Sequence, residues 1–304
     1  MSRSRGTAVA TALLLAALAA AGCGLGPGAD VGTVELTATR DFGTVPVLRR
    51  SLEASESDTA MRVLDASADV STRYGGGYVQ SIEGIAEDER GGRPYDWFFF
   101  VDGVESPVGA ADYALKGGER IWWDYRDWSA TNHVAAVVGS WPAPFVAGYE
   151  GREHPVAVEC EGGACGLVRR ALEAAGVTVA AGSPAGAIRV LVGPWARLRA
   201  DPAAALIEAG PQESGVFADF ERRGSEYALV GLDPGGEPSR DFGPGAGLVA
   251  ATRRYEAPPV WVVTGATPAA VRAAAVLLGG AKLRDHYAVA TEDGKETPLP
   301  VVRP

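Results

Sequence analysis

The residues best suited to molecular recognition are aromatic, and they concentrate in residues 120–128, RIWWDYRDW. This segment is typical of a β-strand, in which successive side chains point to opposite faces. One face would carry Ile121, Trp123 and Tyr125, and the other Trp122, Asp124 and Arg126. An antiparallel strand in a small sheet usually buries one face only, so something further must cover the second aromatic face.

The first interpretation is that most of these aromatics are buried by packing against a second domain through the apolar segment 131–152. A platform for a planar or sugar-like ligand is the alternative, and a protein partner is a third. The residues predicted to contact such a ligand are Tyr74, Tyr78, Trp122, Trp123, Tyr125 and Trp128. Because strand neighbours face opposite ways, Trp122 and Trp123 cannot both touch one ligand, so at least one belongs to the core. Tyr74 and Tyr78 flank a Gly-Gly-Gly segment that is either a loop closing over the ligand or a simple turn.

Cysteine and histidine residues are few. Cys160 and Cys165 flank a Gly-Gly turn in ECEGGACG, and outside the cytoplasm such spacing favours a disulfide over a metal site. The three histidines, His133, His154 and His286, have no zinc-ligand spacing to these cysteines. We therefore expect a disulfide, with buried free thiols as the alternative, and no bound metal.

The sequence contains no familiar catalytic motif. It has no G-x-S-x-G nucleophile elbow, no cysteine–histidine pair and no carboxylate cluster with metal spacing. A hydrolase with two distant carboxylates leaves no local signature, so an enzyme in the C-terminal half remains the least favoured alternative.

The opening residues, MSRSRGTAVATALLLAALAAAGCG, resemble a bacterial lipoprotein signal. A short positive region precedes an apolar run, Thr11 to Ala21, that is too short for a stable membrane anchor. Small residues then lead to Cys23, the predicted site of lipidation with palmitate-like chains. An ordinary secretory peptide cut near Ala21 is the alternative. The resemblance implies a signal peptide at 1–22, a flexible tether at 23–32 and a protein anchored by lipid at the cell membrane, outside the cytoplasm.

The charge of the chain argues against nucleic acid as a partner. The formal net charge of −10 becomes −12 once Arg3 and Arg5 are removed with the signal, and basic residues form no cluster. A nucleic-acid-binding surface needs clustered Lys and Arg. What remains of the 304 residues is long enough for two ordinary domains, each with its own core.

Strands dominate the pattern from Thr33 to Asp127. TVELTATRDFG alternates, VPVLRRSLEA follows as a return strand, and SDTAMRVLDASAD is predicted to be a helix capped by Ser57 or Asp58. Three further strands are predicted in YGGGYVQSIEGI, YDWFFFVDGV and GERIWWDYRDW. This order predicts an α+β, β-grasp-like domain over residues 33–130, in which one helix covers one face of a small mixed sheet.

The run from Gly75 to Tyr125 resembles the C-terminal β-domain of transcobalamin and intrinsic factor, and bacterial domains of unknown function of that type. The shared features are a glycine followed by YVQSIEGI, the aromatic strand DWFFFVDG, the small-residue segment GAADYALKGGE and a final strand. In that family the domain closes over cobalamin held on a larger helical domain, which this sequence does not contain. The resemblance covers about residues 33–128 and implies cobalamin as a candidate ligand, with no other cofactor.

The pattern over residues 153–304 alternates strands and helices, as in an α/β domain with a mixed, partly parallel sheet. The predicted strands are HPVAVEC, VTVAA, AIRVLVG, PPVWVVTG and DHYAVATEDG, with SGVFADF and EYALVGLD as a hairpin. ACGLVRRALEAAG and TPAAVRAAAVLLGG are predicted helices, the second capped by Thr267. PWARLRADPAAALIEAG is helical in two pieces broken at Pro202. SRDFGPGAGLVAATR lacks phosphate-loop spacing and is predicted to be a flexible surface loop.

Two places in this half could bind a ligand. The helix start at Thr267 follows a strand and can hold an anion, although a simple capped turn explains it better. Residues after predicted strands, where α/β sheets often bind ligands, are Trp195, Gln212, Glu213 and Ser214.

Together these patterns predict a lipid-anchored protein facing outside the cytoplasm that recognises a small molecule without catalysis. A corrinoid is the candidate ligand, and a membrane transporter is the candidate partner for uptake. The alternatives are a non-catalytic interaction or scaffold protein of the cell envelope and an enzyme with its site in the α/β domain.

Overall fold

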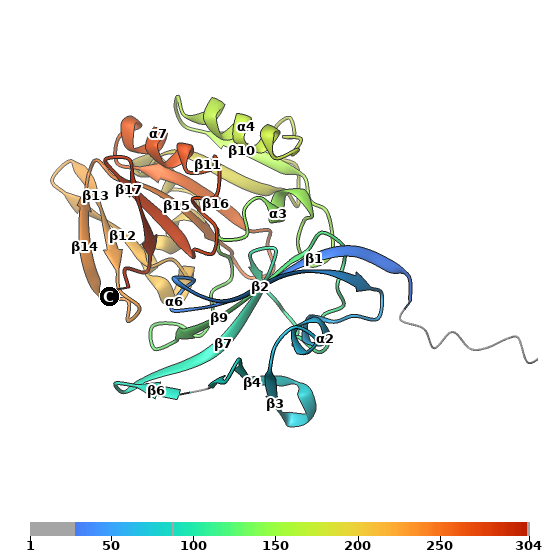
Figure 1. Ribbon diagram of the computed structural model, residues 1–304. Coiled ribbons are helices and arrows are strands. Elements are labelled where there is room, and N and C mark those ends of the chain that lie inside the picture. The colour runs from blue at the N-terminus through green and yellow to red at the C-terminus, as the bar shows by residue number, and fades with distance from the viewer. Residues whose placement is uncertain (1–27, 87, 303–304) are drawn as a thin grey trace, which may run out of the picture.

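The computed structural model describes residues 28–86 and 88–302, and the predicted signal and Cys23 lie outside them. The described chain forms an N-terminal half built on one six-stranded sheet and a C-terminal half built on a second. Figure 1 shows the first half in blue to green and the second in yellow to red, packed directly against each other. The predicted α+β fold followed by a mixed α/β sheet is confirmed. None of the helices in this described part is long and apolar enough to cross a membrane.

The N-terminal sheet has the strand order β2-β1-β9-β7-β6, with β8 paired to β7. Its strands are β1 (Asp30–Arg40), β2 (Val45–Ser55), β6 (Asp88–Arg90), β7 (Arg93–Val101), β8 (Val104–Glu105) and β9 (Arg120–Asp127). β9 is central: it runs parallel to β1 and antiparallel to β7. The short strands β3 (Val70–Arg73), β4 (Tyr78–Ile82) and β5 (Ile85–Ala86) form a separate small sheet, with a 3-10 turn at Tyr74–Gly76.

One helix, α2 (Ala60–Asp65), covers one face of this sheet, as predicted. Ala60, Val63 and Leu64 join the core that contains Trp123 of β9. The predicted cap is wrong by one or two positions, because the Oγ1 of Thr59 accepts the hydrogen bond from the backbone N–H of Arg62. Asp58 accepts instead from the backbone N–H of Ser55, so its carboxylate closes the preceding turn.

The C-terminal sheet has the order β10-β11-β16-β15-β17-β18, and β12, β13 and β14 form a second, three-stranded sheet. The strands are β10 (Val156–Cys160), β11 (Ile188–Pro194), β12 (Ala218–Arg223), β13 (Glu226–Leu232), β14 (Pro238–Gly243), β15 (Gly247–Thr252), β16 (Val260–Gly265), β17 (Ala288–Glu292) and β18 (Lys295–Leu299). β10, β11 and β16 are parallel, whereas β15 is antiparallel to β16 and to β17.

The helices at 165–174 and 268–276 cover one face of the C-terminal sheet, and the three-stranded sheet lies on the other face, together with the helical residues 195–198 and 204–209. The helical segments are α3 (Ala143–Val146), α4 (Cys165–Ala174), α5 (Trp195–Leu198), the 3-10 helix Ala204–Ala209, α6 (Pro211–Ser214) and α7 (Pro268–Val276). α4 and α7 share one core with the sheet, and Figure 1 shows both helices on its outer side. The Oγ1 of Thr267 accepts from the backbone N–H of Ala270, which confirms the predicted cap of α7.

Two predictions in this half are wrong. Residues 239–253, expected to be a flexible loop, form β14, a turn and β15, and all six residues of β15 are buried between two neighbouring strands. A strand buried on both faces shows no alternation, and the glycines before it mark only the turn. Residues 177–181, expected to be a strand, contribute a single bridge from Val179 to Val156.

Candidate functional site

The two faces of the aromatic strand β9 belong to two different cores. Ile121, Trp123 and Tyr125 pack on the side of α2, with Phe99 stacked on Trp123 at 4.7 Å between ring centroids. Trp122 lies on the opposite face, in the core shared with the C-terminal half. All eight residues of β9 are buried. Trp122, Trp123 and Tyr125 are therefore core residues, which corrects their prediction as ligand contacts.

The second face of β9 is covered by the C-terminal half of the same chain. Tyr287 lies against Trp122, with ring centroids 5.5 Å apart, and against Phe100 at 5.6 Å. Phe42, from the turn between β1 and β2, contacts both Tyr287 and Phe217 at 5.1 Å. These edge-to-face contacts join the two halves through one apolar core.

The other predicted ligand contacts lie outside this core. Tyr74 is 86% exposed, and its ring lies 6.3 Å from that of Tyr78, whose hydroxyl donates to Asp96 at 2.5 Å. Trp128 follows β9 and is 37% exposed. The structure therefore brings Tyr74 and Tyr78 together at the small sheet, and each predicted residue on β9 is withdrawn from solvent.

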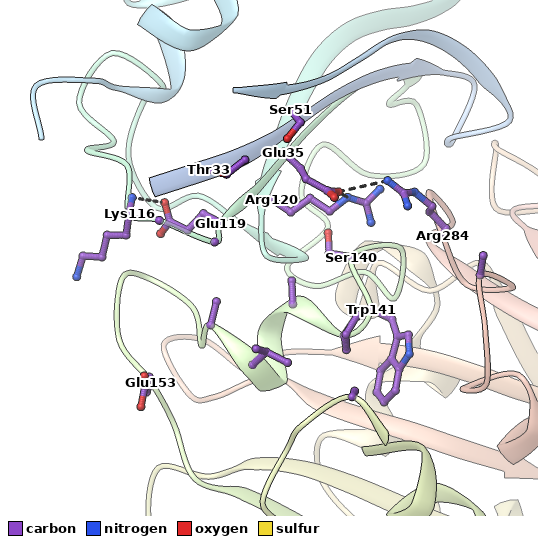
Figure 2. Close-up of a pocket in the computed structure, with 18 of the residues that line it drawn as sticks. Thr33, Glu35, Ser51, Lys116, Glu119, Arg120, Ser140, Trp141, Glu153 and Arg284 are labelled. Carbon is purple, nitrogen blue, oxygen red and sulfur yellow. Dashed lines mark hydrogen bonds and ion pairs between the residues drawn. The ribbon is translucent and has the colours of Figure 1, made fainter. Parts of the chain in front are cut away.

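A cleft of about 990 Å³, which no pattern in the sequence predicted, lies between the two halves. We call it the interdomain cleft. Its upper wall in Figure 2 comes from β1, β2 and the start of β9, and its floor comes from α3 and the residues before it. The lining residues used below are Glu35, Lys116, Glu119, Arg120, Ser140, Trp141, Val146, Glu153 and Arg284. They come from separate stretches of the chain, so no local sequence pattern predicts that they lie together.

The floor of the interdomain cleft is apolar. Trp141, Pro142, Ala143 and Val146 line it, and Trp141 packs on Phe145 at 5.2 Å and on Trp261 at 5.6 Å. Val146 is 52% exposed, although most of its apolar neighbours in segment 131–152 are buried. The expectation that this segment packs along a surface is confirmed, and it leaves one apolar strip facing the cleft.

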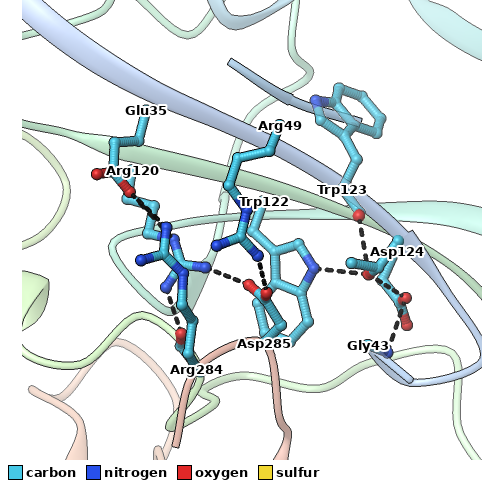
Figure 3. A network of polar contacts seen from close by, with 11 residues as sticks. Glu35, Gly43, Arg49, Arg120, Trp122, Trp123, Asp124, Arg284 and Asp285 are labelled. Atoms are coloured by element: carbon cyan, nitrogen blue, oxygen red, sulfur yellow. Dashed lines mark hydrogen bonds and ion pairs between the residues drawn. The ribbon is translucent and has the colours of Figure 1, made fainter. Parts of the chain in front are cut away.

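The opposite wall is an ion-pair cluster that links the two halves. Asp285, in the loop before β17, accepts hydrogen bonds from Arg49 of β2 and Arg120 of β9. Glu35 of β1 accepts from Arg284 at 3.2 Å and lies 3.9 Å from Arg120. Figure 3 shows these side chains converging from both halves. Arg120 and Asp285 are largely buried, so their pairing is little screened by solvent.

A second polar network lies beside this cluster, within the shared core. The carboxylate of Asp124 accepts from the hydroxyl of Thr39 at 2.6 Å, the backbone N–H of Gly43 at 3.0 Å and the hydroxyl of Tyr287 at 3.1 Å. Trp122 Nε1 donates to the hydroxyl of Thr39 at 2.8 Å. Burial raises the pKa of Asp124 to about 6, and the hydrogen bonds oppose that shift. These three hydrogen bonds to Asp124 explain how a carboxylate is tolerated in the buried core.

Two more carboxylates near the cleft have unusual pKa values for structural reasons. Burial raises the pKa of Asp102 to about 8, and its Oδ1 accepts from the backbone N–H of Arg120 at 2.9 Å. Burial also raises the pKa of Glu119, whose oxygens accept from Tyr113 at 2.9 Å and from the N–H of Lys116 at 2.8 Å. Both carboxyl groups are occupied in holding turns, so neither is free to act on a ligand.

The remaining predicted positions lie away from the interdomain cleft. The Cys160–Cys165 disulfide is present, as expected. Trp195 is buried and stacked on Phe220 at 4.5 Å, and Ser214 donates to the carbonyl of Gly210 at 2.8 Å. The neighbouring Gln212 and Glu213 are exposed on α6 and do not line the interdomain cleft.

The histidines do not form a metal centre. His133 pairs with Glu105, which raises its pKa, and His154 stacks on Tyr149 at 4.1 Å. Burial lowers the pKa of His286. Over the described ranges, no group of three or more His, Cys, Asp or Glu side chains could hold a metal ion.

One segment of the chain is similar to a family of known proteins. Residues 57–127 match a family described as "Domain of unknown function (DUF4430)", which covers α2 to β9. No curated protein matches the chain. The crystal structure of a "putative metal binding protein" from Ruminococcus gnavus is similar over 32% of this chain and 97% of its own length, with 11% identity and a TM-score of 0.25. A score this low supports no conclusion about shared fold or function.

Proposed function

We propose that this protein binds a small molecule in the interdomain cleft and does not transform it. The observation that carries the proposal is the cleft itself: an opening of about 990 Å³ with an apolar floor facing a charged wall. Binding sites for small molecules are typically concave, mostly apolar and placed at domain junctions, with a few polar groups that fix orientation. The two halves share one apolar core, which favours a preformed site between them and so lowers the cost of binding.

The ligand that the resemblance to transcobalamin implies is a corrinoid. In this proposal the β-grasp-like half supplies one wall of the site, and the α/β half takes the place of the helical domain. The Cys23 signal favours a lipid-anchored protein outside the cytoplasm, and a binding protein tethered there would deliver its ligand to a membrane transporter. These roles follow from sequence resemblance and are part of the proposal.

The burial of both faces of β9 also fits a second function, that of a scaffold or interaction protein of the cell envelope. A scaffold needs the interdomain core but not an open cleft with an exposed apolar floor. Binding at Val146 therefore separates the two functions.

The test uses the neutral dye N-phenyl-1-naphthylamine, whose fluorescence rises in apolar sites. We expect saturable binding to the purified protein and a clear loss of affinity in Val146→Asn. The matched control is Val276→Asn, because both valines end a helix and are similarly exposed, 52% and 54%, and only Val146 lines the cleft. No saturable binding, or equal affinity in both variants, would overturn the proposed site.

Competition then tests the corrinoid. Cyanocobalamin added to the dye-loaded protein should displace the dye, with the displacement followed as lost dye fluorescence at wavelengths corrected for corrin absorbance. Failure to displace it at millimolar concentration would exclude this corrinoid as the ligand of the cleft.

A further inference from the structure

One end of the interdomain cleft carries more positive than negative charge. Among the described residues, the guanidinium groups of Arg49, Arg120 and Arg284 pair with two carboxylates, those of Glu35 and Asp285. One positive charge in this cluster therefore has no carboxylate of its own. Two of these arginines line the cleft, and the side chain of Arg284 is 38% exposed whereas that of Arg120 is 7% exposed.

The other charges along the cleft do not cancel this excess. Glu119 is occupied by the Tyr113 hydroxyl and the Lys116 N–H, and burial favours its neutral form. Glu153 is exposed and lies across the cleft from Arg284 in Figure 2. The ammonium group of Lys116 donates to the carbonyl of Gly151, a neutral partner.

Unpaired hydrogen-bond donors lie in the same wall. Within residues 28–86 and 88–302, no partner bonds to Arg120 Nε, Arg284 Nε or the Oγ of Ser140, and all three atoms are buried. Arg120 and Ser140 are themselves nearly inaccessible, at 6% and 1% exposure. Buried donors are almost always satisfied in folded proteins, because each unmade bond is costly. All three donors belong to residues that line one cleft, which is consistent with a ligand that supplies an acceptor there.

We propose that the ligand of the interdomain cleft is an amphipathic anion, with an oxyanion group held by Arg284, Arg120 and Ser140 and an apolar part against Trp141 and Val146. The inference rests on the proposed function and adds the charge of the ligand to it. A guanidinium group suits a carboxylate, sulfonate or phosphate, because its planar fork donates two parallel bonds. The bound oxyanion balances the surplus charge, and the side chain of Arg284, which is 38% exposed, is the one that can move to admit it to the buried donors.

Two dyes that share one skeleton test the charge requirement. 8-Anilinonaphthalene-1-sulfonate carries a sulfonate that N-phenyl-1-naphthylamine lacks, and both brighten in apolar sites. We expect the sulfonate to raise affinity about ten-fold or more, as hydrogen bonds between charged groups do. Arg284→Gln should remove most of that advantage, so that the two dyes bind with similar affinity. The ion pair of Arg284 with Glu35 is exposed, so its loss will barely affect folding.

The control is Arg272→Gln, which makes the same change in net charge at an exposed position of α7 that does not line the cleft. Equal affinities for the two dyes, or equal losses in Arg272→Gln and Arg284→Gln, would overturn the anion inference while leaving the proposed site intact. If neither dye binds saturably, the proposed function is overturned instead. Arg284→Lys keeps the positive charge without the planar guanidinium group, so it should recover part of the higher affinity for the sulfonated dye.

Discussion

Replacing Trp122 with alanine tests whether the two halves of the protein are stabilised by one shared core. Trp122 is fully buried, contacts Phe100 and Tyr287, and donates from Nε1 to Thr39 at 2.8 Å. Truncating a buried Trp to Ala usually costs about 3–5 kcal/mol. Burial of about 150–250 Å² of aromatic surface at about 25 cal/mol per Å² gives a similar figure of about 4–6 kcal/mol. Loss of the indole donor beside Thr39 adds about 1 kcal/mol.

We therefore expect Trp122→Ala to lower the free energy of unfolding by about 4 kcal/mol or more. Urea unfolding followed by far-UV circular dichroism measures this loss, and the wild-type protein should unfold in a single transition because the core is shared. Trp128→Ala is the matched control: its side chain is 37% exposed, so we expect a loss below about 1 kcal/mol.

If Trp122→Ala does not fold at all, Trp122→Phe keeps an aromatic ring in the core and should cost about 1–2 kcal/mol. A loss in Trp122→Ala no larger than that in Trp128→Ala would refute the account of the shared core. Two separate unfolding transitions in the wild-type protein would refute it as well.

Three other changes have defined outcomes. Burial raises the pKa of Asp102 from 3.8 to about 8, so its contribution to stability is fully present below pH 4 and is lost as pH rises through 8. Asp102→Asn should therefore stabilise the protein by more than about 2 kcal/mol at pH 9 and have little effect at pH 4. Urea unfolding at the two pH values measures both effects. Gly43 and Gly176 both have positive φ, of 81° and 83°, but only at Gly43 would a new Cβ lie 1.6 Å from a backbone oxygen of the loop before β17. Gly43→Ala should therefore lower the melting temperature far more than Gly176→Ala. Replacing Cys160 and Cys165 with serine opens a very short loop and should cost about 2 kcal/mol in urea unfolding; no change would mean that the bridge does not constrain the unfolded chain.

Local patterns in the sequence were sufficient to predict most strands and helices. The alternation in residues 120–128 placed Trp123 and Trp122 on opposite faces, and the structure shows each in its own core. The Thr-Pro start of α7 and the closely spaced cysteines were equally direct signals, because a cap and a short disulfide depend on neighbouring residues alone. Of the three interpretations that the sequence left open for the second face of β9, the structure shows packing within the chain.

The interdomain cleft could not be predicted in the same way. Glu35, Arg120 and Arg284 are far apart in the sequence and meet only because β1, β9 and the loop before β17 converge. Each of these residues by itself looks like an ordinary surface charge. The missed strand β15 has a related cause, since its burial depends on strands that precede and follow it, and its sequence shows no period of two.

A crystal structure of the protein soaked with N-phenyl-1-naphthylamine would show directly whether a small molecule binds between the two halves. We expect density for the dye in the interdomain cleft, with its rings against Trp141 and Val146. Density at Tyr74 and Tyr78 instead, or a cleft that stays free of dye at saturating concentration, would rule out the proposed site.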